Sequence, residues 1–171
     1  PMLALSNQKW DKKWRVVIFD IKEINRRTRD LLRYKLKELG FGMLQESVWI
    51  TPHNVGKDMR EYVEANKMGA YIFVLEVEEI LAGDRELLIN KIWKIYQLNK
   101  KYNDLLEEIN KLNKVYVTTH DRDKKHTGKM EELRVKYRVK YLEILMTDPC
   151  LPKELLPEDW AGEKVRKAIG K

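Results

Sequence analysis

The chain has 171 residues, of which 43% are hydrophobic, so one or two small domains with packed cores are expected and general disorder is disfavoured. It has no apolar run near the roughly 18 to 20 residues of a membrane-spanning helix, and its start, PMLALSNQKW, lacks a signal-peptide pattern. The lone cysteine, Cys150, cannot form an internal disulfide, which favours a cytoplasmic setting. The net charge of +7 favours a polyanionic partner, nucleic acid first, although 36% charged residues of both signs also suit a well-solvated surface.

The first half of the chain predicts a βαββαβ order after a polar lead-in at residues 1–13. The run Arg15–Ile21 does not alternate, which is typical of a strand buried on both faces. Apolar residues at helical spacing predict a helix over Glu23–Leu39, and Gly40 stands where a left-handed cap is favoured. Hairpin strands at 41–44 and 47–51, a helix at 57–66 and a strand at 70–77 follow. This order is the ferredoxin-like signature, which we assign to residues 14–82.

The second half predicts a small helical domain over residues 84–171. A wide apolar stripe from 84 to 112 indicates a helix that breaks or joins a bundle, because more than one neighbour must cover it. A coiled-coil dimer is the alternative, although Asn99 interrupts its seam. We expect a short strand at Val115–Thr119, a charged loop at 120–129, and helices at 130–147 and 158–169 on either side of a proline-rich tail. The fold class is therefore α+β, with both parts in one chain.

Asp20 follows the first predicted strand directly. An ionised carboxylate is costly to bury, so an acid at a strand end suggests chemistry. It can hold Mg²⁺ if a dimer axis supplies a second carboxylate, as in a metal-dependent nuclease. The alternative is that Asp20 caps the following helix or pairs with an arginine.

Basic residues follow on the first predicted helix. Arg26, Arg29 and Arg33 are spaced by three and four residues and share a face, and Arg27 and Lys37 widen it. Such a row can contact phosphates without reading sequence. The alternative is a solvated helix face, since nearby Asp30 and Glu38 can pair with the cations.

Other chemistry-bearing residues give weaker signals. His120 and His126 flank two aspartates, but their spacing fits no standard zinc pattern and indicates a polar loop. His53 is expected to shape a turn or touch a ligand, and nothing around Cys150 predicts a nucleophile. Trp49 and Trp93 are expected in the core. No cofactor fingerprint or phosphate-binding loop occurs.

Longer segments carry a family resemblance. VVIFDI, the arginine-bearing helix and QESVWI resemble the ferredoxin-like subunit of CRISPR spacer-acquisition complexes. The match to PaaX-type transcriptional repressors extends further. WRVVIFDI and RRTRDLLRYKLKELGFGMLQESVWITPH resemble that family's central domain, IWKIYQLNKKY its next helix, and YRVKYLEILMTDPCLPKELLPEDWAG its C-terminal signature. HDRDKKHTGK looks like an insertion relative to the family.

The resemblance implies a homodimeric, non-enzymatic repressor whose DNA binding is released by an aryl-CoA effector. The family has an N-terminal winged helix, and residues 1–13 are too short to hold one. The resemblance therefore implies that this chain is the dimerising and effector-facing part, dimeric through its sheet, with the winged helix absent. It also implies that a signature group locks the tail into the fold or lines an effector pocket: Tyr137, Arg138, Asp148, Glu154, Leu155 and Trp160. The alternative is a Mg²⁺-dependent nuclease, or a nucleic-acid-bridging subunit, of the CRISPR type.

Overall fold

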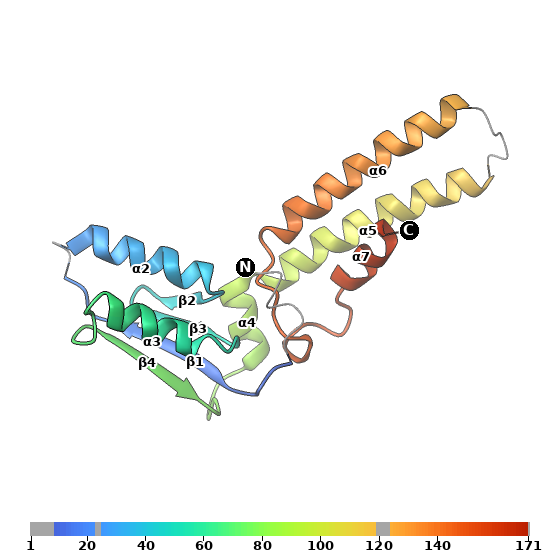
Figure 1. The fold of residues 1–171 in the computed structure, drawn as a ribbon. Helices are drawn as coiled ribbons and strands as arrows, with labels where there is room; N and C mark the ends of the chain where they lie inside the picture. The colour runs from blue at the N-terminus through green and yellow to red at the C-terminus, as the bar shows by residue number, and fades with distance from the viewer. Residues whose placement is uncertain (1–8, 23–24, 119–123, 171) are drawn as a thin grey trace. The chain divides into compact units, whose positions relative to one another are not determined.

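The computed structural model describes residues 9–22, 25–118 and 124–170. Its fold class is α+β, as predicted, and the chain divides into two compact units (Figure 1). The first unit runs to Trp93 and takes in Pro149–Leu156, and the second consists of Lys94–Asp148 and Pro157–Lys171. The proline-rich segment of the tail thus returns to the first unit between two stretches of the second.

The first unit has the ferredoxin-like βαββαβ order. Its elements are β1 (Trp14–Phe19), α2 (Arg26–Glu38), β2 (Gly42–Gln45), β3 (Val48–Thr51), α3 (Gly56–Ala65) and β4 (Ile72–Val77). All strand pairs are antiparallel, in the order β2-β3-β1-β4. The first strand therefore lies between the third and the fourth, as the ferredoxin-like fold requires.

Helices α2 and α3 cover one face of this sheet (Figure 1). Leu32 and Leu36 of α2 and Met59 of α3 are fully buried against Val17 and Trp49 of the central strands. These residues recur at helical spacing on the helices and alternate on β1, which is why they converge on one layer. The expected core position of Trp49 is confirmed.

Local signals explain where the helices end. Gly40 has a φ of 80°, and the N–H of Phe41 donates to the carbonyl of Leu36, so the predicted left-handed cap of α2 is confirmed. The first predicted residues of this helix, Glu23 and Ile24, lie outside the described residues. At α4 (Arg85–Trp93), Asp84 accepts the N–H of Leu87 and so caps the helix start.

Helix α4 packs against β2, although the sequence grouped it with the C-terminal helices. Gly42 makes this contact possible, because a Cβ at this position would lie 2.0 Å from Ile92 Cγ2 and 2.7 Å from the Trp93 ring. Lys94 follows with a φ of 55°, a left-handed conformation that ends α4. The predicted break in the helix at 84–112 therefore lies at Lys94. Trp93, which was expected in the core, is only half-buried.

The second unit is helical. It contains α5 (Ile95–Thr118), α6 (Lys124–Leu145) and α7 (Gly162–Ile169), and each packs against the other two. The strand predicted at Val115–Thr119 is wrong, because residues 115–118 continue α5. Helix continuation satisfies the backbone within the segment, whereas a lone β-branched run needs a partner strand. The charged loop predicted at 120–129 is wrong for residues 124–129, because α6 begins at Lys124. His120, Asp121 and Asp123 lie outside the described residues.

Candidate functional site

The sheet face opposite α2 and α3 carries an apolar patch. Two rows of side chains cross β3, β1 and β4 there: Val48, Ile18 and Phe73 in one, and Ile50, Val16 and Leu75 in the other. Phe73 is 58% exposed, Leu75 43% and Ile18 38%. The prediction that β1 is buried on both faces is therefore wrong at Ile18, because α2 and α3 both pack on the other side. Large apolar side chains grouped in the open typically mark an interaction surface.

The predicted arginine row on α2 is split between two environments. Arg26 and Arg27 are exposed at the start of the helix, and Arg26 pairs with Asp30 at 3.8 Å. Arg29 and Arg33 are half-buried on the flank of the helix, and Arg33 Nη2 lies 3.5 Å from the carbonyl oxygen of Glu46. The start of α2 thus exposes two arginines to solvent, one of them paired with Asp30, whereas Arg33 also contacts the β2–β3 turn.

Asp20 is exposed just beyond the end of β1, and its backbone N–H donates to the carbonyl of Tyr71 at 2.9 Å. Among the described residues, no three His, Cys, Asp or Glu side chains are grouped so that they could hold a metal ion. Within the described part of the chain, Asp20 is therefore not part of a group of metal ligands.

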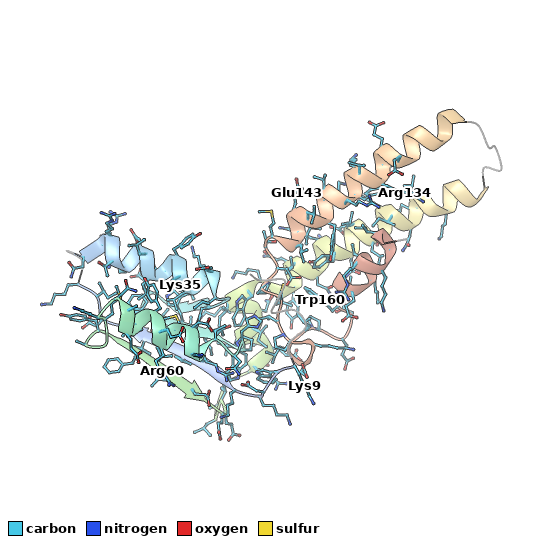
Figure 2. All side chains as sticks on the ribbon, viewed as in Figure 1. Lys9, Lys35, Arg60, Arg134, Glu143 and Trp160 are labelled. Carbon is cyan, nitrogen blue, oxygen red and sulfur yellow. The ribbon has the colours of Figure 1, made fainter. Side chains whose placement is uncertain are left out.

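The C-terminal signature is only partly brought together. Asp148 is buried and accepts the Tyr102 O–H at 2.8 Å, and Trp160 packs edge-on against the same Tyr102 ring at 5.3 Å (Trp160 is labelled in Figure 2). Glu154 is exposed, beside the buried Leu155, in a short 3-10 helix of the first unit, η2 (Lys153–Leu155). The signature therefore includes a packed cluster around Tyr102.

The remaining signature residues lie on α6. Tyr137 is half-buried and Arg138 is exposed. Within the second unit, they lie on the helical hairpin rather than in the loop that carries Trp160.

Asn99 holds the tail onto α5 in a way that the sequence did not reveal. Its side-chain NH₂ donates to Asp159 Oδ1 at 3.0 Å, and its side-chain oxygen accepts the Ala161 N–H at 2.9 Å. Both the NH₂ group and the oxygen of the Asn99 side chain thus form hydrogen bonds just before α7. A buried polar residue within an apolar helical stripe was the available signal, since such groups require partners.

His53 has a comparable role in the first unit. It is 2% exposed, and its Nε2 lies 3.0 Å from the carbonyl oxygen of Pro149. Because a carbonyl oxygen only accepts, Nε2 carries the proton. Burial lowers the pKa of His53 below its usual value, with a smaller opposing effect from the Pro149 hydrogen bond. The neutral imidazole therefore links the β3–α3 loop to Pro149 of the C-terminal tail. His53 lies in the turn where the sequence placed it.

Arg15 is the other buried polar centre, and the sequence did not predict it. Its guanidinium is 3% exposed and binds Asp11 through both of its Nη atoms, at 2.8 and 2.5 Å. It also donates to Asn54 at 3.1 Å and Glu76 at 3.2 Å. The hydrogen bond from Arg15 lowers the pKa of the Asp11 carboxyl, and the same bond raises the pKa of Arg15. The lead-in before β1 is thus anchored electrostatically.

Two hollows lie in the first unit. One, of about 360 Å³, has Arg15 and Arg60 in its wall together with Glu64 and Glu76, so its charges are mixed. The other, of about 350 Å³, lies between the β1–α2 and α3–β4 connections and has two cations, Lys22 and Lys67, in its wall. The residues in its wall are Ile21, Lys22, Asn25, Thr28, Asn66, Lys67, Met68 and Tyr71. None of the described helices has the length and apolar content of a membrane-spanning segment.

These features define a two-part α+β protein, a ferredoxin-like unit with an open apolar sheet face and a helical unit closed by its tail. Two adjacent family models match almost the whole chain: the PaaX protein central Cas2-like domain at residues 7–89 and the PaaX-like protein C-terminal domain at residues 93–171. The chain belongs to the PaaX-type family, as its sequence motifs predicted.

The chain is also similar to two individual proteins. The chain is 23% identical to the transcriptional repressor PaaX of Escherichia coli over 161 residues, which is 92% of this chain and 50% of the repressor. It is also similar to the solved structure of an uncharacterized protein from Mycobacterium tuberculosis, with a TM-score of 0.66 and 25% identity over 99% of this chain and 62% of the other. The chain thus spans between half and two thirds of the length of these relatives.

Proposed function

We propose that this chain is the dimerising and effector-sensing part of a cytoplasmic PaaX-like transcriptional repressor. The open sheet face formed by Val16, Ile18, Val48, Phe73 and Leu75 carries the proposal. In this proposal the DNA-reading winged helix lies outside these 171 residues, and the chain itself performs no catalysis.

A homodimer fits the sheet face because a two-fold axis brings the same patch into contact with itself. Ile18 lies at the middle of one row, between Val48 and Phe73, so the face is apolar along its centre. Contact with a second copy would remove these side chains from water, and each Å² of buried apolar surface contributes about 25 cal/mol.

The molar mass in solution tests this part of the proposal. Wild-type protein is expected to be a dimer, and Phe73→Glu to be largely monomeric, because the symmetry buries the new charge twice. A central interface residue typically contributes about 2 kcal/mol or more, or roughly a thirtyfold rise in the dimer Kd. Tyr34→Glu is the matched control, since Tyr34 is 71% exposed on α2, on the covered side of the sheet. A monomeric wild-type protein, or an unchanged dimer in Phe73→Glu, would contradict it.

The effector is proposed to be an aryl-CoA thioester, as the family resemblance implies. The hollow lined by Lys22 and Lys67 supports a ligand with phosphate groups, because two cations border it. A thermal-shift screen of acyl-CoA compounds is the test, since a ligand that prefers the folded state raises Tm. A positive shift that Lys22→Ala reduces, with free CoA as the comparison compound, would support the assignment. No shift with any CoA thioester would contradict it.

The alternative function is nucleic-acid work of the CRISPR spacer-acquisition type, for which the exposed Arg26 and Arg27 and the strand-end Asp20 are the relevant observations. Mg²⁺-dependent cleavage of single- or double-stranded DNA or RNA that disappears in Asp20→Ala would establish a nuclease. Binding that is sequence-blind, falls steeply with salt and weakens when Arg26, Arg27, Arg29 and Arg33 are neutralised would instead establish a bridging subunit. Our proposal expects no cleavage and weak operator binding by this chain.

A further inference from the structure

Helix α6 has two opposite apolar stripes. Leu133, Tyr137 and Ile144 are half-buried and share a face with Lys140, whose Nζ lies 2.6 Å from Glu108 Oε2 on α5. The short ion pair fixes this face towards α5. An amphipathic helix needs only one apolar stripe, so a second one on the far side is unexplained by the packing of the unit.

The second stripe is exposed. It consists of Val135, Val139, Leu142 and Met146, which are 51%, 49%, 55% and 83% exposed. These residues follow one another by four, three and four positions, which is the alternation of a heptad seam. Met146 lies one residue past the end of α6, but its N–H still donates to the Leu142 carbonyl at 2.9 Å, so it remains in register.

We propose that this stripe is a seam on which α6 of a second copy of this chain packs. The charges that flank the seam favour this occupant. Lys136 and Glu143 lie along one side, Glu131 and Arg138 along the other, and all four are exposed. In coiled coils, residues at these flanking positions form ion pairs between the helices and set their orientation.

A second copy pairs all four charges when the helices are parallel, and it pairs Lys136 and Glu143 when they are antiparallel. With the two helices parallel and in register, Glu131 faces the partner's Lys136 and Arg138 faces the partner's Glu143. With the helices antiparallel, Val139 packs against the partner's Leu142, and Lys136 faces the partner's Glu143. Glu143 therefore meets a cation in both arrangements, so the surface is complementary to itself (Glu143 is labelled on α6 in Figure 2).

The seam is separate from the sheet face, because the two surfaces belong to different units of the chain. Self-association through α6 therefore does not depend on the proposed sheet dimer. Four layers make a short seam, well below the roughly 1,600 Å² of a standard interface, so a measurement that traps weak pairing is needed.

Oxidative crosslinking of engineered cysteines provides that measurement. In a parallel pair Val139 faces itself, so Val139→Cys alone forms a covalent dimer. In an antiparallel pair Val139 faces Leu142, so the double variant Val139→Cys/Leu142→Cys crosslinks and the single one does not. Arg134→Cys is the matched control on α6 away from the seam, where Arg134 is 55% exposed (labelled in Figure 2), and the wild type, with only the buried Cys150, gives the background.

We expect the yield of covalent dimer from one of the seam variants to exceed that of Arg134→Cys severalfold. Adding Glu143→Lys should lower this yield, and a second reversal should restore it: Arg138→Glu in a parallel pair, or Lys136→Glu in an antiparallel pair. Seam yields no higher than those of Arg134→Cys would overturn the proposal, whatever the oligomeric state of Phe73→Glu shows about the sheet face. Helical circular dichroism equal to that of the wild type confirms that each variant is folded.

Discussion

The Tyr102 hydroxyl donates to the carboxylate of Asp148 across 2.8 Å, which joins the middle of α5 to a residue 46 positions later in the chain. The Tyr102 ring also contacts Trp160 and Tyr141, at centroid distances of 5.3 and 6.3 Å. One side chain thus holds the C-terminal end of α6 and the segment just before α7 in the same cluster.

Tyr102→Phe should destabilise the protein. It keeps the ring against Trp160 but removes one donor from the buried Asp148, and a hydrogen bond of this kind typically contributes about 0.5–1.5 kcal/mol to stability. The free energy of unfolding in urea measures the loss. Tyr34→Phe, at a 71% exposed position, should leave this free energy unchanged. Equal stability of Tyr102→Phe and the wild type would show that the hydrogen bond does not contribute.

Asn99→Ala should loosen α7 before the rest of the second unit. The substitution removes the partners of the Ala161 N–H and of Asp159, and we expect a loss of about 2 kcal/mol. Hydrogen exchange of the α7 amides should accelerate more than exchange within α2. Asn110→Ala, at an exposed position on the same helix, serves as the control. Uniform acceleration across both units would argue against a local role for Asn99 at the tail.

Gly42→Ala should disrupt the packing of α4 on β2. The new Cβ would lie 2.0 Å from Ile92 Cγ2 and 2.7 Å from the Trp93 ring, so the helix must move. Overpacking of this kind typically costs about 1–3 kcal/mol. Thermal unfolding and near-ultraviolet circular dichroism of the tryptophans would record both effects. Gly69→Ala has open space around its Cβ and should behave like the wild type.

Stability should fall at mildly acidic pH because of His53. Burial lowers its pKa in the folded protein below the usual value of 6.5, so the unfolded chain binds more protons between these two values. The contribution of neutral His53 is complete above about pH 6.5 and decreases as the pH falls towards the folded-state pKa. Urea titrations at pH 5.5 and 7.5 would measure the difference.

The matched variant for this test is His53→Gln, which keeps an N–H donor for the Pro149 carbonyl but does not titrate. Its stability should depend less on pH over the same interval. The hydrogen bond from Arg15 lowers the pKa of Asp11 below its usual value of 3.8. The stability that Asp11 contributes is therefore lost only as the pH falls below 3.8, outside the interval of this test. A wild-type profile that coincides with that of His53→Gln would exclude His53 as the titrating group.

The βαββαβ order, the family and the cap at Gly40 could all be predicted from the amino-acid sequence. These follow from periodicity and from residue types whose effects are local: Leu32 and Leu36 lie on one helix face at their spacing, and glycine adopts a left-handed φ without strain. Local patterns gave a wrong prediction where the same residues can form either a strand or a helix. The β-branched run at 115–118 continues α5, because helix continuation satisfies its backbone groups without a partner strand.

Which surfaces stay exposed and which polar groups form pairs depends on the three-dimensional fold. The sequence of β1 does not alternate, which predicted a strand buried on both faces. Ile18 is exposed because α2 and α3 both pack on the opposite face of the sheet. Residues far apart in the chain form hydrogen-bonded pairs that residue spacing cannot predict: Tyr102–Asp148, Asn99–Ala161 and His53–Pro149. They form because a buried polar group must find a partner, and the fold alone determines which partner lies within reach.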